Sequence, residues 1–256
     1  MGRNVIWISL VVFFCVWLGF SSGAWGQVIW YVDDDAAVGG DGKSWEGAFG
    51  GLQEALDVAV SGDEIWVAEG VYRPTSDYGL GIGERGRHFR MKNGVGIYGG
   101  FADTGEAVWE DRDLNIYVTV LSGDLLGNDD PVTVAKDLLN NPSRADNCYH
   151  VFYHPEGLAL EGSSVLDGFV ITGGQADQPL FSTPHRYGGG MYNKNSSPKV
   201  VHCHFTGNMA DIYGGGMSNF TSSPTVSDCT FSLNLSIYNG GGQYRCGSVV
   251  CRWGGW

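Results

Sequence analysis

Residues 188–239 consist of two copies of one sequence, GGGMYNKNSSPKVVHCHFTGNMADIY and GGGMSNFTSSPTVSDCTFSLNLSIYN, which align without a gap. The copies place identical residues at seven landmarks: Gly188 and Gly214, Met191 and Met217, Asn193 and Asn219, Pro198 and Pro224, Cys203 and Cys229, Phe205 and Phe231, Asn208 and Asn234. A third copy opens with three glycines at 240–242 and then loses the pattern. A period of 26 residues is typical of a solenoid, in which each repeat stacks on its neighbours.

Each copy predicts two or three short β-strands joined by turns, without a helix. We therefore predict an all-β fold in which the strands stack as a parallel β-helix, each repeat forming one rung. The inward-facing set of the first copy is expected to be Met191, Val200, Cys203 and Phe205. The three-residue step from Val200 to Cys203 breaks strict alternation and predicts a bend at 201–202.

Side chains at equivalent positions of stacked rungs should lie about 4.8 Å apart. Asn193 with Asn219, and Asn208 with Asn234, are then expected to form hydrogen-bonded ladders at the turns, as stacked asparagines do in cross-β arrays. Cys203 and Cys229 would also stack. A buried apolar pair of thiols is favoured over a disulfide, because five cysteines remain once Cys15 is removed with a leader. The roles of Cys246 and Cys251 are left open.

The segment before the repeats predicts a cap followed by less regular rungs. Apolar residues recur on one face of an expected helix from Trp45 to Val60, which would cover the N-terminal end of the stack. Short strands and turns follow, and the 24-residue spacing from Ile97 to Leu121 suggests equivalent positions in two such rungs. The triplet 171–173 aligns with 205–207. Three inserts, 103–113, 125–146 and 178–185, are expected to leave the stack as loops and to carry any specific chemistry.

The N-terminus is typical of a Sec-type signal peptide. Arg3 precedes an apolar run from Val5 to Phe20, and the small-residue stretch that follows predicts cleavage after Gly26. The chain is thus divided into a signal peptide (1–26), an N-terminal strand and capping helix (27–63), degenerate rungs with inserted loops (64–186) and regular repeats (187–256). We expect no transmembrane helix after cleavage, and an exported monomer in the extracellular space, at the cell surface or at the outer membrane.

The amino-acid composition limits the classes of partner that the chain can bind. The 256 residues carry a net charge of −13, and phosphate binding needs clusters of Lys and Arg, so a nucleic-acid partner is excluded. The same charge disfavours polyanionic sugars unless Ca²⁺ bridges the two. Asp33, Asp34, Asp35 and Asp41 form an acidic loop that could hold Ca²⁺, although its spacing is not that of an EF-hand, and a solvated loop is the alternative. No other cofactor is expected.

The pairing of GGGM with FTGN and FSLN resembles the chlamydial polymorphic outer membrane protein repeat. The order of SWEGAFGGLQEALDVAVSGDEIWVAEGVYRPT, MKNGVGIYGGF, TVLSGD, NCYHVF and VLDGFVITGG before the repeats is similar to that of exported right-handed parallel β-helix proteins with choice-of-anchor modules. The resemblance covers about 30–239 and implies a right-handed β-helix, export and the pectin-lyase-like superfamily. The tail QYRCGSVVCRWGGW departs from it, without an anchor, which suggests a truncated product.

The sequence favours a non-catalytic surface protein over an enzyme. Asp211 and Asp228 are the only acids between 188 and 239, whereas a glycoside hydrolase needs converging carboxylates. Tyr187, Tyr192 and Tyr213 flank the glycine turns and could stack on sugars. His202 and His204 could bind a metal, but polar surface positions explain them better. We therefore expect an adhesin-like or envelope scaffold that binds polysaccharide or other envelope components; the alternative is a polysaccharide lyase or glycoside hydrolase.

Overall fold

The computed structural model describes residues 26–103, 105, 107–179, 183–238, 241, 243–246 and 251–252. The strands are β1 Ile29–Val32, β2 Glu64–Ala68, β3 Gly70–Tyr72, β4 Gly96–Phe101, β5 Thr119–Ser122, β6 Phe152–His154, β7 Val165–Asp167, β8 Val170–Thr172, β9 Gln175–Ala176, β10 Met191–Lys194, β11 Lys199–Val201, β12 His204–Thr206, β13 Met209–Ala210, β14 Met217–Phe220, β15 Thr225–Ser227, β16 Thr230–Ser232, β17 Leu235–Ser236, β18 Gln243–Cys246 and β19 Cys251–Arg252. The helices are α1 Leu52–Val58 and the 3-10 turns η1 Glu84–Gly86, η2 Trp109–Asp111, η3 Ala135–Leu138, η4 Pro142–Arg144 and η5 Pro184–Arg186. The protein is thus mostly β, as predicted.

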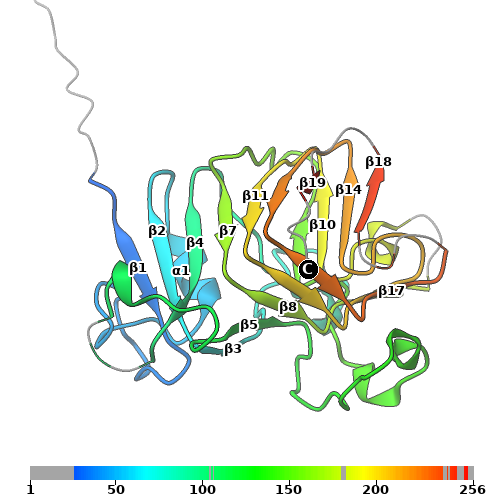
Figure 1. Ribbon diagram of the computed structural model, residues 1–256, viewed down its shortest axis with the longest axis horizontal. Coiled ribbons are helices and arrows are strands. Elements are labelled where there is room, and N and C mark those ends of the chain that lie inside the picture. The colour runs from blue at the N-terminus through cyan, green and yellow to red at the C-terminus, as the bar shows by residue number, and fades with distance from the viewer. Residues whose placement is uncertain are drawn as a thin grey trace, which may run out of the picture.

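The strands form four sheets in which neighbouring strands run parallel. Sheet A has the order β1-β2-β4-β7-β11-β15-β19, sheet B β16-β12-β8-β5-β3, sheet C β18-β14-β10-β6 and sheet D β17-β13-β9. Figure 1 shows the strands of sheet A side by side, from β1 at the N-terminal end toward the repeats, with β3, β5 and β8 crossing below them. We call one set of consecutive strands that contributes to each of the four sheets a rung.

The 26-residue repeat corresponds to one rung. The first copy supplies β10, β11, β12 and β13, and the second supplies β14, β15, β16 and β17. Their pairing joins Met191 to Met217, Val200 to Val226 and Phe205 to Phe231, which is the alignment of the two sequences. The expectation of two or three strands per repeat was too low: each copy has four, because Met209–Ala210 and Leu235–Ser236 form short strands of their own.

The core lies between the sheets. The four side chains predicted to face inward, Met191, Val200, Cys203 and Phe205, are all at most 1% exposed, and the Phe205 and Phe231 rings stack at 4.8 Å with an interplanar angle of 6°. The predicted bend is also present. His202 has φ +47° and its equivalent Asp228 has φ +53°, a left-handed conformation that reverses the alternation between sheets A and B.

Both asparagine ladders are present. The Asn193 amide donates to Asn219 Oδ1 at 2.8 Å, and the Asn208 amide donates to Asn234 Oδ1 at 3.0 Å. Asn208 Nδ2 also donates to the Ile171 carbonyl, and Asn234 Nδ2 to the Phe205 carbonyl one rung later. Asn208 and Asn234 therefore supply hydrogen bonds to the backbone of the turns where the strand ladders stop. Asn193 and Asn219 lie within β10 and β14 rather than at turns, and their bonds join side chains.

The two stacked cysteines are reduced, as expected. Cys203 is buried, Cys229 is partly exposed and both are free thiols. The Cys203 backbone N–H donates to Cys229 Sγ at 3.4 Å. The side chains of Cys246 and Cys251 lie outside the described residues.

The N-terminal helix is shorter than predicted. Helix α1 spans Leu52–Val58, whereas the segment from Trp45 to Gly51 is not helical. The reason is that Phe49 pairs with β1: its N–H donates to the Tyr31 carbonyl at 2.9 Å, and the Asp33 N–H donates to the Phe49 carbonyl at 2.9 Å. The helix buries Leu52, Ala55 and Leu56 beside β1 and β2, so the loop and the helix together cover this end of the core.

The spacing prediction for the degenerate region was wrong. Ile97 lies on β4 in sheet A and pairs with Ile65 and Leu166, whereas Leu121 lies on β5 in sheet B and pairs with Tyr72 and Ile171. The 24-residue spacing therefore joins different sheets. The segment 88–92 is not a strand and makes only one isolated bridge, from Phe89 to Phe152. The alignment of 171–173 with 205–207 is confirmed by the pairing of Ile171 with Phe205.

The insert at 125–146 packs against the sheets. It projects below them in Figure 1 and carries η3 and η4. Arg144, which is 3% exposed, bonds to Asp129 Oδ2 at 2.9 Å and donates to Gln175 Oε1 at 2.7 Å. The buried Arg144 guanidinium therefore joins the insert to β9 and holds the insert against the rung that contains β9.

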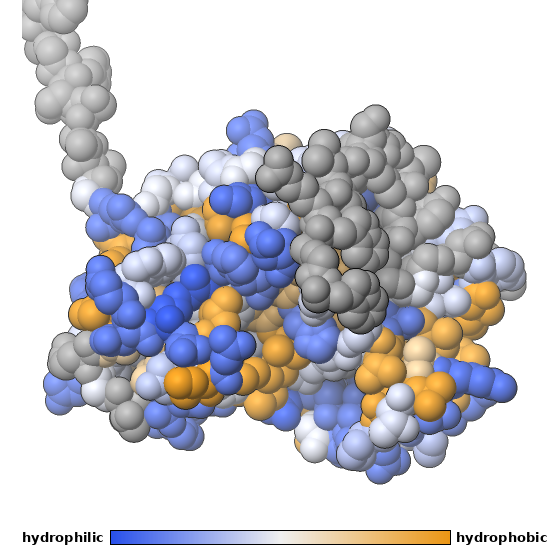
Figure 2. Space-filling model, in the orientation of Figure 1, coloured by the Kyte–Doolittle hydropathy of each residue, from blue (hydrophilic) through white to orange (hydrophobic). Residues whose placement is uncertain are grey.

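The surface in this view is mixed. Figure 2 shows hydrophilic residues over most of the face, with hydrophobic residues gathered in separate patches. Among the described residues no helix is long and apolar enough to cross a membrane. The predicted signal peptide is 1–26, of which all but Gly26 lies outside the described part of the chain.

Candidate functional site

A groove of about 400 Å³ lies on the outer face of sheet C. Because Met191 and Asn193 point into the core, alternation along β10 directs Tyr192 and Lys194 outward. Tyr153 of β6 pairs with Tyr192, and their rings stack at 5.5 Å with an interplanar angle of 21°. These two rings form the floor of the groove.

One wall of the groove comes from the insert before the first repeat. Thr183, Pro184 and Tyr187 line it, and η5 holds this part of the insert against the rung. Tyr187 makes an isolated parallel bridge with Tyr213, and its ring lies 6.4 Å from Tyr192 and 5.9 Å from Tyr213. We call residues 183–187 the strap.

The other wall carries the charged groups. Glu156 Oε2 lies 2.7 Å from Lys194 Nζ, and Glu156 Oε1 accepts from the Asn195 amide at 3.3 Å. The pKa of the Glu156 carboxyl is lowered by the hydrogen bond and the positive charge of Lys194. Phe220, which is 42% exposed, pairs with Lys194 from the next rung and extends the wall with an apolar ring.

Buried histidines support the floor and the strap from behind. His150 Nδ1 lies 2.9 Å from the Gly188 carbonyl, which can only accept, so Nδ1 carries the proton. His150 Nε2 must therefore accept from His185 Nδ1, which lies 2.9 Å away on η5. The His150 ring stacks on Tyr153 at 4.9 Å. This pair fixes both tautomers and ties the strap to the rung.

These histidines are neutral. Burial lowers the pKa of His150 well below its usual value, and burial lowers the pKa of His185 to about 4. The pKa of His88, whose ring meets Tyr153 edge-on, falls to about 3 through burial and the nearby positive charge of Arg90. The histidines themselves therefore add no positive charge behind the aromatic floor at neutral pH.

The structure brings the three predicted tyrosines together. Tyr187 contacts both of the others, and Tyr187 and Tyr192 line the groove, while Tyr213 supports Tyr187 from the side. The sequence reasoning missed Tyr153, Glu156 and the rest of the lining. Tyr153 could have been found by aligning FYH (152–154) with MYN (191–193), because these segments pair residue for residue.

Three of the four predicted metal ligands bond to the backbone. Asp34 Oδ2 accepts from the Val71 N–H at 2.8 Å and Asp33 Oδ1 from the Asp35 N–H at 3.0 Å. The exposed Asp41 accepts from the Lys43 N–H at 3.2 Å and also forms an ion pair with the Lys43 ammonium. Among the described residues no group of three or more His, Cys, Asp or Glu side chains is arranged to hold a metal ion. Ca²⁺ binding by this loop stays a prediction of the sequence.

The two histidines of the H-x-H motif have different partners. His202 Nδ1 lies 3.1 Å from Asp167 Oδ1, which also accepts from Arg112 at 2.7 Å, whereas His204 Nε2 lies 2.7 Å from Ser232 Oγ. His202 sits at the bend and His204 on β12, so strand alternation does not bring their rings together. Both histidines therefore fit the interpretation that they are polar surface residues.

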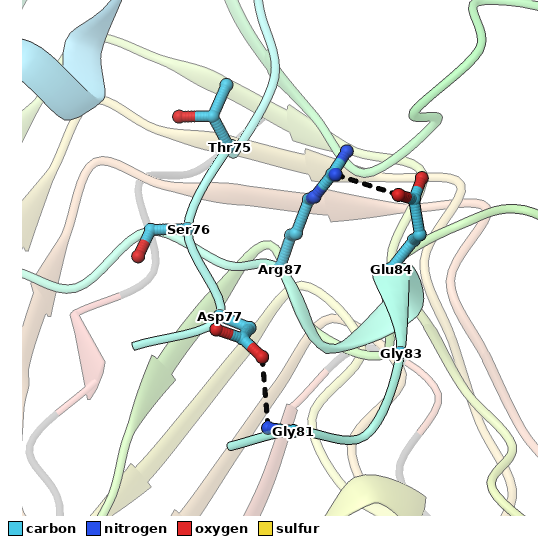
Figure 3. Close-up of a pocket in the computed structure, with 7 residues that line it drawn as sticks. All are labelled: Thr75, Ser76, Asp77, Gly81, Gly83, Glu84 and Arg87. Carbon is cyan, nitrogen blue, oxygen red and sulfur yellow. Dashed lines mark hydrogen bonds and ion pairs between the residues drawn. The ribbon is translucent and has the colours of Figure 1, made fainter. Parts of the chain in front are cut away.

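A second cavity, of about 570 Å³, lies among loops near η1 (Figure 3). Its charged groups are satisfied within the loops: Asp77 accepts from the Gly79 and Gly81 N–H groups, and Arg87 bonds to Glu84 at 2.9 Å. Figure 3 shows the bond between Asp77 and Gly81 and the ion pair between Arg87 and Glu84. This cavity lacks the aromatic side chains that line the groove on sheet C, where Phe220 is exposed and Tyr187 is partly exposed, so that groove is the better candidate site.

Comparisons with protein-family models, with curated proteins and with solved structures each found no match to this chain.

Proposed function

We propose that this chain is an exported, non-catalytic carbohydrate-binding protein of the cell surface or outer membrane, built as a right-handed parallel β-helix. The observation that carries the proposal is the groove on sheet C, where Tyr153, Tyr192, Tyr187 and Phe220 surround a space of about 400 Å³. Aromatic rings offer large apolar faces with a polar edge, and such rings stack well on sugars.

The β-helix is supported by the order of the strands. Each repeat contributes to sheets C, A, B and D in that sequence, and each strand pairs in parallel with its equivalent 26 residues later. Crossovers between parallel strands are right-handed in nearly all proteins. This architecture would present the groove on a rigid outer face.

A binding role is favoured over catalysis by the chemistry of the lining. Glu156 is the one carboxylate among the described lining residues, and Lys194 is already bonded to it. Glycoside hydrolysis by the usual route needs two carboxyl groups on opposite sides of the scissile bond. The chain would act as a monomeric adhesin-like or scaffold protein toward polysaccharide or envelope components.

Glycan binding tests the proposal directly. Calorimetric titration with a panel of soluble oligosaccharides should give saturable binding, and Tyr187→Ala should weaken it at least tenfold. Tyr117→Ala removes a half-buried tyrosine beside sheet B and should leave the affinity unchanged. Failure of every sugar to bind the folded protein would refute the proposed function.

The enzyme alternative is tested with polyuronates and neutral polysaccharides, incubated with and without Ca²⁺. We expect no unsaturated uronides and no new reducing ends, whereas their release would establish a lyase or hydrolase. Export is tested by N-terminal sequencing of the protein outside the cell. We expect it to begin at Gln27, and a start at Met1 would contradict signal cleavage.

A further inference from the structure

We infer that the groove selects uncharged glycan segments and that the Glu156–Lys194 pair sets this selectivity, an inference that rests on the proposed carbohydrate-binding function. The pair contributes the only two charged side chains among the described residues that line the groove. They lie 2.7 Å apart and neutralise each other. A glycan carboxylate or sulfate would therefore meet no unpaired cation in the lining.

The strap and the histidines behind the floor add no unpaired cation to the groove. Arg186, which belongs to the strap, is bound by Asp211 through Nε and Nη2 at 3.1 and 3.0 Å. The imidazoles of His150 and His185 behind the floor are held in their neutral forms by burial and by their mutual hydrogen bond. Arg90 interacts electrostatically with Tyr153 from behind the floor, but it lines a separate cavity, where its guanidinium covers the Tyr78 ring at 4.2 Å and bonds to His88.

The electrostatic field of the whole chain also disfavours anionic sugars. The chain has a net charge of −13, so a polyuronate approaching the groove would be repelled. A neutral sugar avoids this repulsion, and its hydroxyls can bond to both members of the ion pair, since such groups fix orientation in an otherwise apolar pocket. The volume of 400 Å³ lies toward the low end of ligand pockets, which suits a short segment of a chain.

Charge exchange at Glu156 provides the test. Glu156→Gln leaves Lys194 unpaired on an exposed wall, so the groove gains one positive charge without loss of a buried contact. Glu161→Gln, at an exposed acid beside Asn93, changes the net charge equally and serves as the matched control. Neutral hexasaccharides of glucan, mannan, galactan and xylan would be titrated beside oligogalacturonate and oligoguluronate at low salt.

The wild-type chain should bind at least one neutral hexasaccharide at least tenfold more tightly than any uronate. Glu156→Gln should reduce the ratio of neutral-sugar affinity to uronate affinity at least fivefold, because the variant binds uronates more tightly and the neutral hexasaccharide more weakly. Glu161→Gln should leave this ratio unchanged. Equal or tighter uronate binding by the wild type, or equal behaviour of the two variants, would overturn the inference and leave the proposed function standing. Binding of no sugar by the wild type would overturn both.

Discussion

The side-chain amide of Asn193 donates to Oδ1 of Asn219 at 2.8 Å, and both side chains are fully buried. Asn193 Oδ1 lies 2.6 Å from His154 Nδ1, and His154 Nε2 accepts from the Met91 N–H at 3.3 Å. The Met91 donor fixes the His154 tautomer, so the proton sits on Nδ1. This relay is a chain of hydrogen bonds in which each group donates to the next, from Met91 through His154 and Asn193 to Asn219. It crosses the three rungs that contain β6, β10 and β14.

Asn193→Leu should therefore be strongly destabilising. It leaves the His154 N–H and Asn219 Oδ1 buried without a partner, and two such groups cost roughly 2–6 kcal/mol together. Urea denaturation followed by circular dichroism measures the loss. Asn115→Leu, at an exposed site in an insert, is the control and should change stability by less than about 0.5 kcal/mol. Equal stability of the two variants would contradict the relay.

Phe205→Ala should destabilise the protein more than the same change one rung later. Phe205 is fully buried and stacks on Phe231, which is only partly buried. Removing a buried phenylalanine costs about 3–5 kcal/mol, since the cavity closes only in part. Phe231→Ala should cost less than half as much. Denaturant midpoints of the two variants give the comparison, and a larger loss at Phe231 would show that the second repeat carries the core.

The sequence predicted the repeat region well because a duplicated unit aligns its own contacts. Met191, Asn193 and Phe205 each pair with their copies, so register follows directly from spacing. Before residue 187 the internal reference is limited to short matches such as 171–173 with 205–207, and Ile97 was matched to a residue of another sheet. Phe49 fits a helical face, yet it pairs with β1, because covering an open strand edge outweighs a weak local preference.

The groove was only half predictable for a related reason. Tyr187, Tyr192 and Tyr213 stood out because they flank repeated glycine turns. Glu156 and Lys194 are separated by 38 positions in the chain, and nothing in the sequence indicates that the loop after β6 returns to β10. Contacts that depend on loop conformation carry no periodic signal.

Acid should destabilise the protein through its buried histidines. The pKa of His154 falls to about 4 through burial, and that of His185 also falls to about 4, from an ordinary value of 6.5. As pH drops below about 6.5 the unfolded chain takes up protons that the folded chain refuses, so stability is lost until pH falls below about 4. Each histidine contributes roughly 3 kcal/mol over this range.

Unfolding free energies measured between pH 7 and pH 4 check this prediction. His185→Gln should flatten the profile, because the unfolded chain then loses one proton-binding group that the folded chain excludes. Asn115→Gln, at an exposed site that does not titrate, should leave the slope unchanged. Stability that rises toward acid would show that these histidines are charged in the folded protein.

Arg144→Met should release the insert at 125–146. The variant leaves the Asp129 carboxylate without its cation, and breaking a buried pair by removing one partner costs about 3–5 kcal/mol. Limited proteolysis should then cut within 125–146 faster than in the wild type. Lys43→Met breaks an exposed pair with Asp41 and should not change the cleavage pattern. An unchanged cleavage rate in the Arg144 variant would show that other contacts hold the insert.

The described cysteines should differ in reactivity. The pKa of the Cys148 thiol is raised to about 12 by burial, and burial also raises that of Cys203. The hydrogen bond from the Cys203 side chain lowers the pKa of Cys229, which is partly exposed. Alkylation with iodoacetamide, followed by peptide mapping, should label Cys229 before the other two. Early labelling of Cys148 would contradict the packed core.

The groove combines parts with separate structural origins. Its floor belongs to sheet C, where Tyr192 shares a strand with the ladder residue Asn193, while the strap comes from an insert between β9 and β10. Loop grafting can therefore replace residues 183–187 without touching the ladders that set the register. The same separation would let related chains diversify their ligand preference by insertion and deletion at one turn, with the scaffold left intact.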